Sequence, residues 1–203
     1  MVEPVVEPVV EPVVEKAALP IVRTAMLVGA YRWAEHRLFE LTGAWAAEPS
    51  PPAVQVHLDE VSAQHAWHAE LWADRLPVLD WFDPDRVTVP FGSAGPLLDA
   101  LADLAEPVRR LAGLYRVVVP RLVAGYDYHL ARTVPATDGP VIRALRLVGR
   151  DEVDAWRAGE ARLQALLTSP ADASAAADAQ RELEAVVVAT GGHVGLFPWS
   201  EDR

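Results

Sequence analysis

The chain has 203 residues, of which about half are hydrophobic, and a formal net charge of −11. This length and composition fit a single domain with a substantial buried core. The absence of cysteine excludes disulfides, thiolate metal ligands and a cysteine nucleophile, so any metal site must use nitrogen and oxygen ligands. The acidic balance argues against nucleic acid as a partner, because binding to phosphates depends on clustered positive charge.

The beginning of the chain lacks the basic segment that opens a secretory signal. No uninterrupted apolar run reaches the roughly 18 residues that a membrane-spanning helix needs. We therefore expect no membrane partner and a cytoplasmic location.

Residues 2–13 repeat the tetrapeptide Val-Glu-Pro-Val three times. Proline at every fourth position removes amide donors and disfavours helix at the preceding residue. The repeat therefore predicts an extended, low-complexity arm over residues 1–16, outside a helical domain that covers residues 17–203.

The first two helices are predicted from apolar residues at helical spacing. The first covers residues 20–46, and its apolar stripe consists of Leu27, Tyr31, Ala34, Leu38, Leu41 and Trp45. The second covers residues 51–79, with Ser50 as its N-cap and Pro51 at its first helical position. The turn between these two helices is short, so they should be antiparallel neighbours.

Three more helices follow in the second half of the chain. A continuous apolar stripe predicts one helix over residues 96–132, kinked at Pro120. The turn at residues 137–140 precedes a helix that reaches residue 166. A fifth helix follows Ser169 and Pro170 and ends near Gly191.

The connection over residues 80–95 is the only long internal loop that the sequence predicts. Its 16 residues can stretch to about 53 Å, whereas the helix before it is about 42 Å long. The connection can therefore traverse the whole bundle, so that the second and third helices run in the same direction. Simple up-and-down order is the alternative, and we prefer the crossover.

His65 and His68 lie three residues apart on the predicted buried stripe of the second helix, among Val54, Leu58 and Trp72. Both nitrogens of a buried imidazole need partners. Two neighbouring histidines therefore indicate either a hydrogen-bonded core network or half of a metal site.

The rise of an α-helix places the candidate partners along the bundle axis. Glu35 lies about 20 Å from the first turn, and the two histidines lie about 22 to 27 Å from it. Glu152 lies about 20 Å from the turn before its helix, whereas His129 lies only about 6 Å from that turn. The predicted metal ligands are therefore Glu35, His65, His68 and Glu152. Tyr115, Val118 or Val119 is expected across from Glu152, with Tyr115 near the four ligands, and His129 is set aside.

Three segments carry a resemblance to a known family: residues 37–40 (Arg-Leu-Phe-Glu), residues 64–72 (Gln-His-Ala-Trp-His-Ala-Glu-Leu-Trp) and residues 151–154 (Asp-Glu-Val-Asp) followed by Gly159 and Glu160. They resemble ferritin-like proteins of actinobacterial type, which are distantly similar to the tRNA-hydroxylase branch, and the likeness spans residues 20–168. It implies an all-α, ferritin-like four-helix bundle with one long crossover between the second and third helices and an additional C-terminal helix.

The resemblance also implies a metal site, with one carboxylate from each of two helices and a Glu-x-x-His pair from each of the other two. The chain departs from that pattern. The second helix has His65 and His68 in place of a Glu-x-x-His pair, and Ala155 stands where a histidine would follow Glu152. The ligand pattern is therefore degenerate.

Two functions from different classes fit these residues. The first is a non-haem, metal-dependent oxidoreductase in which iron or manganese acts on dioxygen or a small molecule, with Tyr115 as a catalytic neighbour of the metal; the ligand set would also suit zinc. The second is a non-catalytic binding or assembly protein without a cofactor, in which the same residues form a metal-free core network. A homodimer is compatible with both, and a tRNA partner is disfavoured by the acidic charge.

Overall fold

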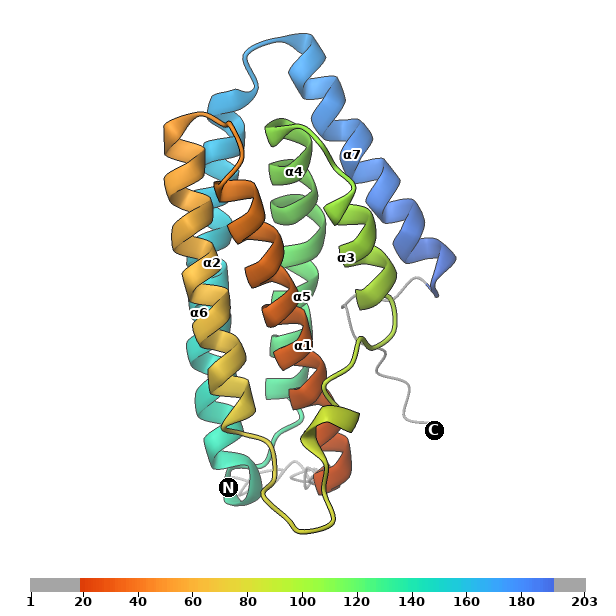
Figure 1. The fold of residues 1–203 in the computed structure, drawn as a ribbon. Coiled ribbons are helices and arrows are strands. Elements are labelled where there is room, and N and C mark those ends of the chain that lie inside the picture. The colour runs from red at the N-terminus through yellow and green to blue at the C-terminus, as the bar shows by residue number, and fades with distance from the viewer. Residues whose placement is uncertain (1–18, 192–203) are drawn as a thin grey trace, which may run out of the picture.

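The computed structural model describes residues 19–191, and within that range every regular element is a helix (Figure 1). The expected all-α class is confirmed for this part of the chain. The predicted arm at residues 1–16 and the last twelve residues, 192–203, lie outside it.

The first two helices, α1 (Ile21–Ala46) and α2 (Pro52–Ala73), pack against each other as an antiparallel pair. The predicted capping of α2 is wrong. Pro51 has an extended backbone and is itself the N-cap, because a residue that precedes a proline disfavours the helical conformation. The Ser50 hydroxyl caps nothing and is buried without a hydrogen-bond partner among the described residues. The helix also ends at Ala73, earlier than predicted, and Pro77 follows in the connection.

The single helix predicted over residues 96–132 is also wrong, because the structure divides it. α3 (Ala94–Ala102) is separated from α4 (Pro107–Gly113) by a break in which Glu106 is extended before its proline. α4 continues through one π-helical turn, η2 (Leu114–Val118), into α5 (Val119–Leu130). The irregularity predicted at Pro120 is found in this π turn, just before the proline that lacks an amide donor.

The last two helices are α6 (Pro135–Leu166) and α7 (Pro170–Ala189). The predicted turn at residues 137–140 is instead the first part of α6, where the Asp138 carboxylate accepts a hydrogen bond from the amide of Val134. α7 starts as predicted, at a capping box formed by Ser169 and Asp172. It packs against α4 and α3 (Figure 1).

The helix directions show how the chain is connected. In Figure 1, α1 and α6 run one way, whereas α2 and the continuous α4–η2–α5 segment run the other way. The chain returns along the bundle through residues 74–93, which contain the short 3-10 helix η1 (Pro84–Arg86), and then through α3. The second and third long helical segments are therefore parallel, as the loop length predicted. The traverse is made by a loop together with a helix and not by the loop alone.

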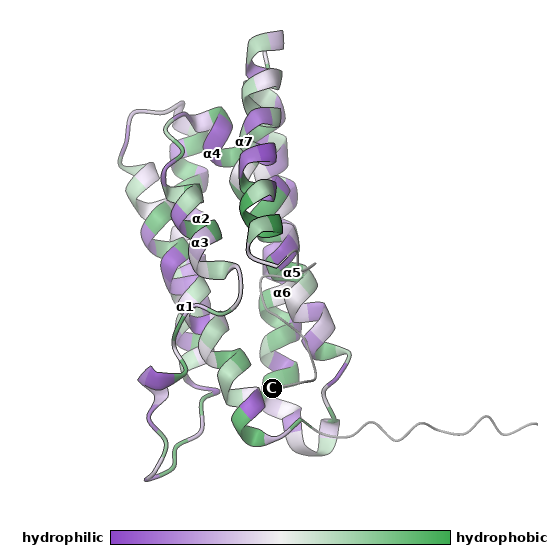
Figure 2. Cartoon of the chain, turned by 90° about the vertical axis from the view of Figure 1, so that its right-hand side faces the viewer, coloured by the Kyte–Doolittle hydropathy of each residue, from purple (hydrophilic) through white to green (hydrophobic). Residues whose placement is uncertain are grey.

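Each α-helix contributes buried residues to the core, and hydrophilic and hydrophobic residues are mixed along the helices (Figure 2). The largest buried side chains are aromatic and include Tyr31, Trp72, Tyr115 and Tyr126. Several ionisable side chains are buried among them, and these define the candidate site described below. None of the helices within residues 19–191 combines the length and apolarity needed to cross a membrane.

Candidate metal centre

Four buried ionisable side chains converge in the middle of the bundle. They come from three helices, and one potential ligand atom of each lies within 4.8 Å of those of the other three. The residues are Glu35 of α1, His65 and His68 of α2, and Glu152 of α6. We call them the Glu/His cluster. They are the four residues that the sequence predicted as metal ligands, and the structure brings all of them together.

The donor atoms of the Glu/His cluster form a ring in which nitrogen and oxygen alternate. His65 Nδ1 lies 2.6 Å from Glu35 Oε2 and 3.3 Å from Glu152 Oε1. His68 Nδ1 lies 3.5 Å from the same Glu35 oxygen and 3.1 Å from the same Glu152 oxygen. Each carboxylate therefore directs one oxygen to both imidazoles, and each imidazole directs its Nδ1 to both carboxylates.

This ring has the size of a metal coordination sphere. Metal–ligand bonds of about 2.0 to 2.2 Å place neighbouring donors roughly 3.3 Å apart in a tetrahedral site and roughly 2.9 Å apart in an octahedral one. The four edges, 2.6 to 3.5 Å, bracket both values. Imidazole nitrogen with carboxylate oxygen is also a donor set that suits divalent iron, manganese or zinc.

Two polar atoms of the Glu/His cluster take no part in the contacts among its four members. Glu152 Oε2 and His65 Nε2 are buried, and neither has a hydrogen-bond partner among residues 19–191. Leaving such atoms unpaired is costly in a protein interior. The second oxygen of Glu152 is therefore available as a further ligand atom, and the residues present fit a metal ion.

The electrostatics of the cluster favour charged side chains despite complete burial. Burial alone would raise the pKa of Glu35, but the positive charges of His68 and His65 outweigh it and lower this pKa to about 2. Burial alone would lower the pKa of His68, but Glu35 and Glu152 raise it to about 10. The same two carboxylates raise the pKa of His65. Without a metal, the surroundings of both imidazoles therefore favour their protonated form.

Two further side chains orient the cluster from outside. The Tyr126 hydroxyl of α5 donates a hydrogen bond of 2.5 Å to Glu35 Oε1, the oxygen that faces away from the ring. Asp151 Oδ2 lies 3.4 Å from Nε2 of His68, opposite the nitrogen in the ring. Such outer contacts fix the orientation of metal ligands in proteins. Neither Tyr126 nor Asp151 is among the site residues predicted from the sequence.

Tyr115 contacts a histidine outside the Glu/His cluster, because its hydroxyl lies 2.6 Å from His57 Nε2. Burial raises the pKa of Tyr115, and the charge of Glu152 adds a smaller effect in the same direction. The Tyr115 ring lies against Gly159, where an added Cβ would come within 2.2 Å of it. His57 is buried.

His129, which the height argument set aside, lies outside the cluster. Its Nδ1 is 3.1 Å from the hydroxyl of Tyr31. The Tyr31 ring contacts both Trp72 and Tyr126, with ring centroids 5.1 and 4.9 Å apart. An aromatic layer therefore separates the Glu/His cluster from His129.

Tyr126 could have been found from the sequence. It continues the apolar stripe of the predicted third helix four residues after Leu122. The level of Glu152 predicts a neighbour near Tyr115, and no residue of the third helix is predicted opposite Glu35. Asp151 gave a weaker signal, because an acidic residue next to a ligand is usually solvated.

Comparisons of the chain with known protein families, with curated protein sequences and with solved structures give no significant match. The assignment of a function therefore depends on the geometry of the Glu/His cluster and on the connectivity of the bundle.

Proposed function

We propose that this chain is a ferritin-like helical-bundle protein that binds one divalent metal ion, iron or manganese, at the Glu/His cluster and uses it as a non-haem oxidoreductase. The observation that carries the proposal is the ring of alternating nitrogen and oxygen donors, with edges of 2.6 to 3.5 Å, inside a mainly apolar core. The parallel arrangement of α2 and α4–η2–α5 supports the ferritin-like class, because one long crossover is typical of such bundles.

Charge balance supports a divalent ion in particular. The two carboxylates carry two negative charges, which either two imidazolium protons or one divalent ion with two neutral imidazoles can neutralise. An uncompensated charge in this interior would cost several kcal/mol. Binding of the metal near neutral pH should therefore release up to two protons, one from each histidine.

The side chains of the cluster have separable roles in this proposal. Glu35, His65, His68 and Glu152 would hold the ion, which would supply redox chemistry toward dioxygen or a small molecule at coordination positions that the protein leaves open. Tyr126 holds Glu35 in one orientation through its 2.5 Å hydrogen bond, and Asp151 holds the ring of His68. The apolar helices around the cluster exclude water from it.

A metal-free core network is the second candidate, and the raised pKa values of the two histidines favour it. With both imidazoles protonated, the Glu/His cluster is electroneutral and already contains a 2.6 Å hydrogen bond between His65 and Glu35. In this case the chain is a non-catalytic binding or assembly protein. It then binds no stoichiometric metal and keeps its stability in a chelator.

Metal analysis of the full chain, purified without an affinity tag, separates the two candidates. We expect about one equivalent of iron or manganese per chain, and its loss from the double variant His65→Gln, His68→Gln. The matched control is His36→Gln, which changes an exposed histidine on α1. Equal, near-zero metal in the wild type and the double variant after reconstitution with Fe²⁺, Mn²⁺ or Zn²⁺ would sink the metalloprotein proposal.

The redox part of the proposal needs its own measurement. Protein reconstituted with Fe²⁺ without oxygen should consume dioxygen when it is mixed with aerated buffer, and the double variant should consume no more than free Fe²⁺ does. Stoichiometric metal without dioxygen consumption would leave a metal-binding protein and overturn the oxidoreductase assignment.

A further inference from the structure

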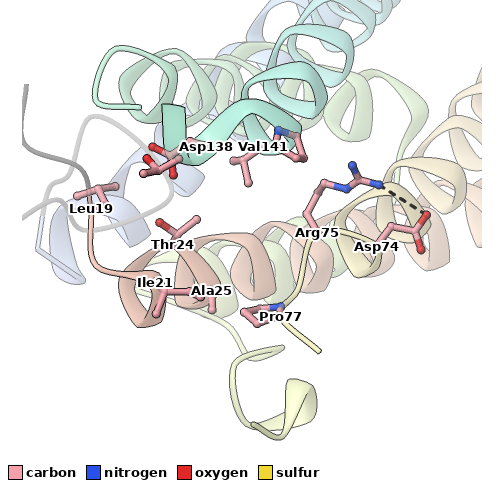
Figure 3. A pocket seen from close by; sticks show the side chains of 11 residues that line it. Leu19, Ile21, Thr24, Ala25, Asp74, Arg75, Pro77, Asp138 and Val141 are labelled. Atoms are coloured by element: carbon pink, nitrogen blue, oxygen red, sulfur yellow. Dashed lines mark ion pairs between the residues drawn. The ribbon is translucent and has the colours of Figure 1, made fainter. Parts of the chain in front are cut away.

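A pocket lies at the end of the bundle opposite the α1–α2 turn, away from the Glu/His cluster (Figure 3). It has a volume of about 550 Å³ and lies between the start of α1, the segment after α2 and the start of α6. This volume is within the range of about 300 to 1,000 Å³ that small-molecule pockets occupy. Arg75 follows the end of α2 at Ala73, and none of the four members of the Glu/His cluster lines the pocket, so the pocket is separate from the cluster.

The walls of the pocket are mainly apolar. Figure 3 shows Ile21 and Ala25 of α1 on one side and Val141 of α6 on the other, with Pro77 beside them. Leu19 lies at one end. An aliphatic chain of several carbons would therefore find apolar surface on more than one side.

Among residues 19–191, Arg75 is the only cationic residue that lines this pocket. It extends from the segment after α2 into the space between α1 and α6 (Figure 3). Its Nε is buried and has no hydrogen-bond partner within residues 19–191. Arg75 forms an ion pair with Asp74, in which Nη2 of Arg75 lies 3.9 Å from Oδ2 of Asp74. This distance is too long for a hydrogen bond. The guanidinium has five donors, and the described part of the chain, residues 19–191, leaves most of them without a hydrogen bond.

The two acidic residues of the lining leave Arg75 available. Asp138 lies away from Arg75 in Figure 3, and its Oδ2 accepts the hydrogen bond from the amide of Val134. The Asp74 side chain is 73% exposed, so its contact with Arg75 is screened by water. A carboxylate that enters the pocket could instead form a paired, charge-assisted contact with the guanidinium.

We propose that this pocket binds a medium-chain aliphatic carboxylic acid, with its carboxylate on Arg75 and its hydrocarbon chain along Ile21, Ala25 and Val141. The guanidinium of Arg75 indicates an anionic head group, because its donors lack partners in the described part of the chain. The apolar walls indicate a hydrocarbon tail. The inference is independent of the proposed metal site.

Titration of the full chain with octanoate, 1-octanol and butanoate tests this proposal by calorimetry or ligand-observed NMR. Octanoate should bind most tightly. Butanoate should bind at least tenfold more weakly, because each buried methylene contributes about fourfold to affinity. The substitution Arg75→Gln should weaken octanoate at least about tenfold, the usual effect of losing a charge-assisted hydrogen bond, and should leave 1-octanol unchanged.

Matched variants separate a loss of the pocket from a loss of folding. Arg86→Gln changes an exposed arginine in η1 and should leave octanoate binding unchanged. Ile21→Glu places a negative charge on the exposed first position of α1, at the pocket wall, and should weaken octanoate while helical circular dichroism is retained. The double variant His65→Gln, His68→Gln should bind octanoate normally, so failure of the metal proposal and failure of this one are distinguishable. No binding of octanoate by the wild-type chain, or equal binding by Arg75→Gln, overturns the proposal.

Discussion

The bundle contains two kinds of buried histidine, and comparing them shows what makes a cation site. His65 and His68 face two carboxylates, and their pKa values are raised. His57 and His129 face the hydroxyls of Tyr115 and Tyr31, and their pKa values are lowered. All four are among the buried polar residues.

Burial by itself lowers the pKa of each of these histidines, and it is the largest single influence on all four. The buried carboxylates of Glu35 and Glu152 reverse that effect in the Glu/His cluster. A tyrosine hydroxyl carries no charge, so the pairs that contain it keep neutral imidazoles. The carboxylates, and not the histidines that first attract notice in the sequence, therefore give the cluster its capacity for a cation.

The largest expected effect comes from removing one of these carboxylates. Glu35→Gln keeps the shape of the side chain but leaves two imidazoles with one carboxylate, so we expect metal affinity to fall more than about 100-fold. The free energy of unfolding of the metal-free protein should fall by about 3 kcal/mol, because a buried charge loses its partner. Isothermal titration with Mn²⁺ and urea unfolding measure the two effects. Glu40→Gln, an exposed position on α1, is the control, and equal behaviour of the two variants would refute the role of Glu35.

The contributions of His68, in the Glu/His cluster, and of His129, beside Tyr31, should make the free energy of unfolding change with pH in opposite directions. The raised pKa of His68, about 10, stabilises the metal-free fold fully below about pH 6.5, and this contribution is lost as the pH rises toward 10. The lowered pKa of His129, about 4, stabilises the fold above about pH 6.5, and this contribution is lost as the pH falls toward 4. Chemical unfolding of His68→Gln and His129→Gln across this range, compared with the wild type, should give difference curves of opposite slope. Difference curves with slopes of the same sign would contradict the contrast between the carboxylate-paired and the tyrosine-paired histidines.

The packing of the Tyr115–His57 pair gives the next effect in size. Gly159→Ala should lower the free energy of unfolding by about 2 kcal/mol, because the new Cβ would come within 2.2 Å of the buried Tyr115 ring. Gly149→Ala on the same helix meets open space and should raise stability by up to about 1 kcal/mol. Thermal and urea unfolding measure both. Metal binding should change little in either variant, and a large loss of affinity in Gly159→Ala would show that Tyr115 belongs to the metal site after all.

The smallest effect tests the orientation of Glu35. Tyr126→Phe removes the hydroxyl that donates to Glu35 Oε1, and metal affinity should fall roughly tenfold, as it does for outer contacts of metal ligands. Tyr128→Phe, two residues away on α5, is the control. The absorption spectrum of the Co²⁺-substituted protein should change only in Tyr126→Phe, and an unchanged spectrum and affinity would remove Tyr126 from the site.

Much of the candidate site could be predicted because it depends on regular helices. Glu35 lies on α1 and His65 and His68 on α2, and both helices are uninterrupted, so a constant rise places them at one level. Glu152 could be placed in the same way on α6. The contact of Tyr115 with His57 could not be predicted in this way, because the helix of Tyr115 contains a π turn and starts at Pro107, so neither the level nor the facing direction of its residues follows from a constant rise.

The helical class, the short α1–α2 connection, the start of α7 after Ser169 and Pro170 and the four members of the Glu/His cluster could be predicted from the amino-acid sequence. These follow from local propensity and from helical periodicity, which act over a few turns of one chain segment. Three features depend on tertiary packing: Tyr126 holds Glu35, Tyr115 faces His57, and Arg75 lines a mainly apolar pocket, with no hydrogen-bonding partner for its Nε among residues 19–191. Those contacts join helices far apart in the sequence, and they depend on how the helices rotate and shift against each other as the core packs.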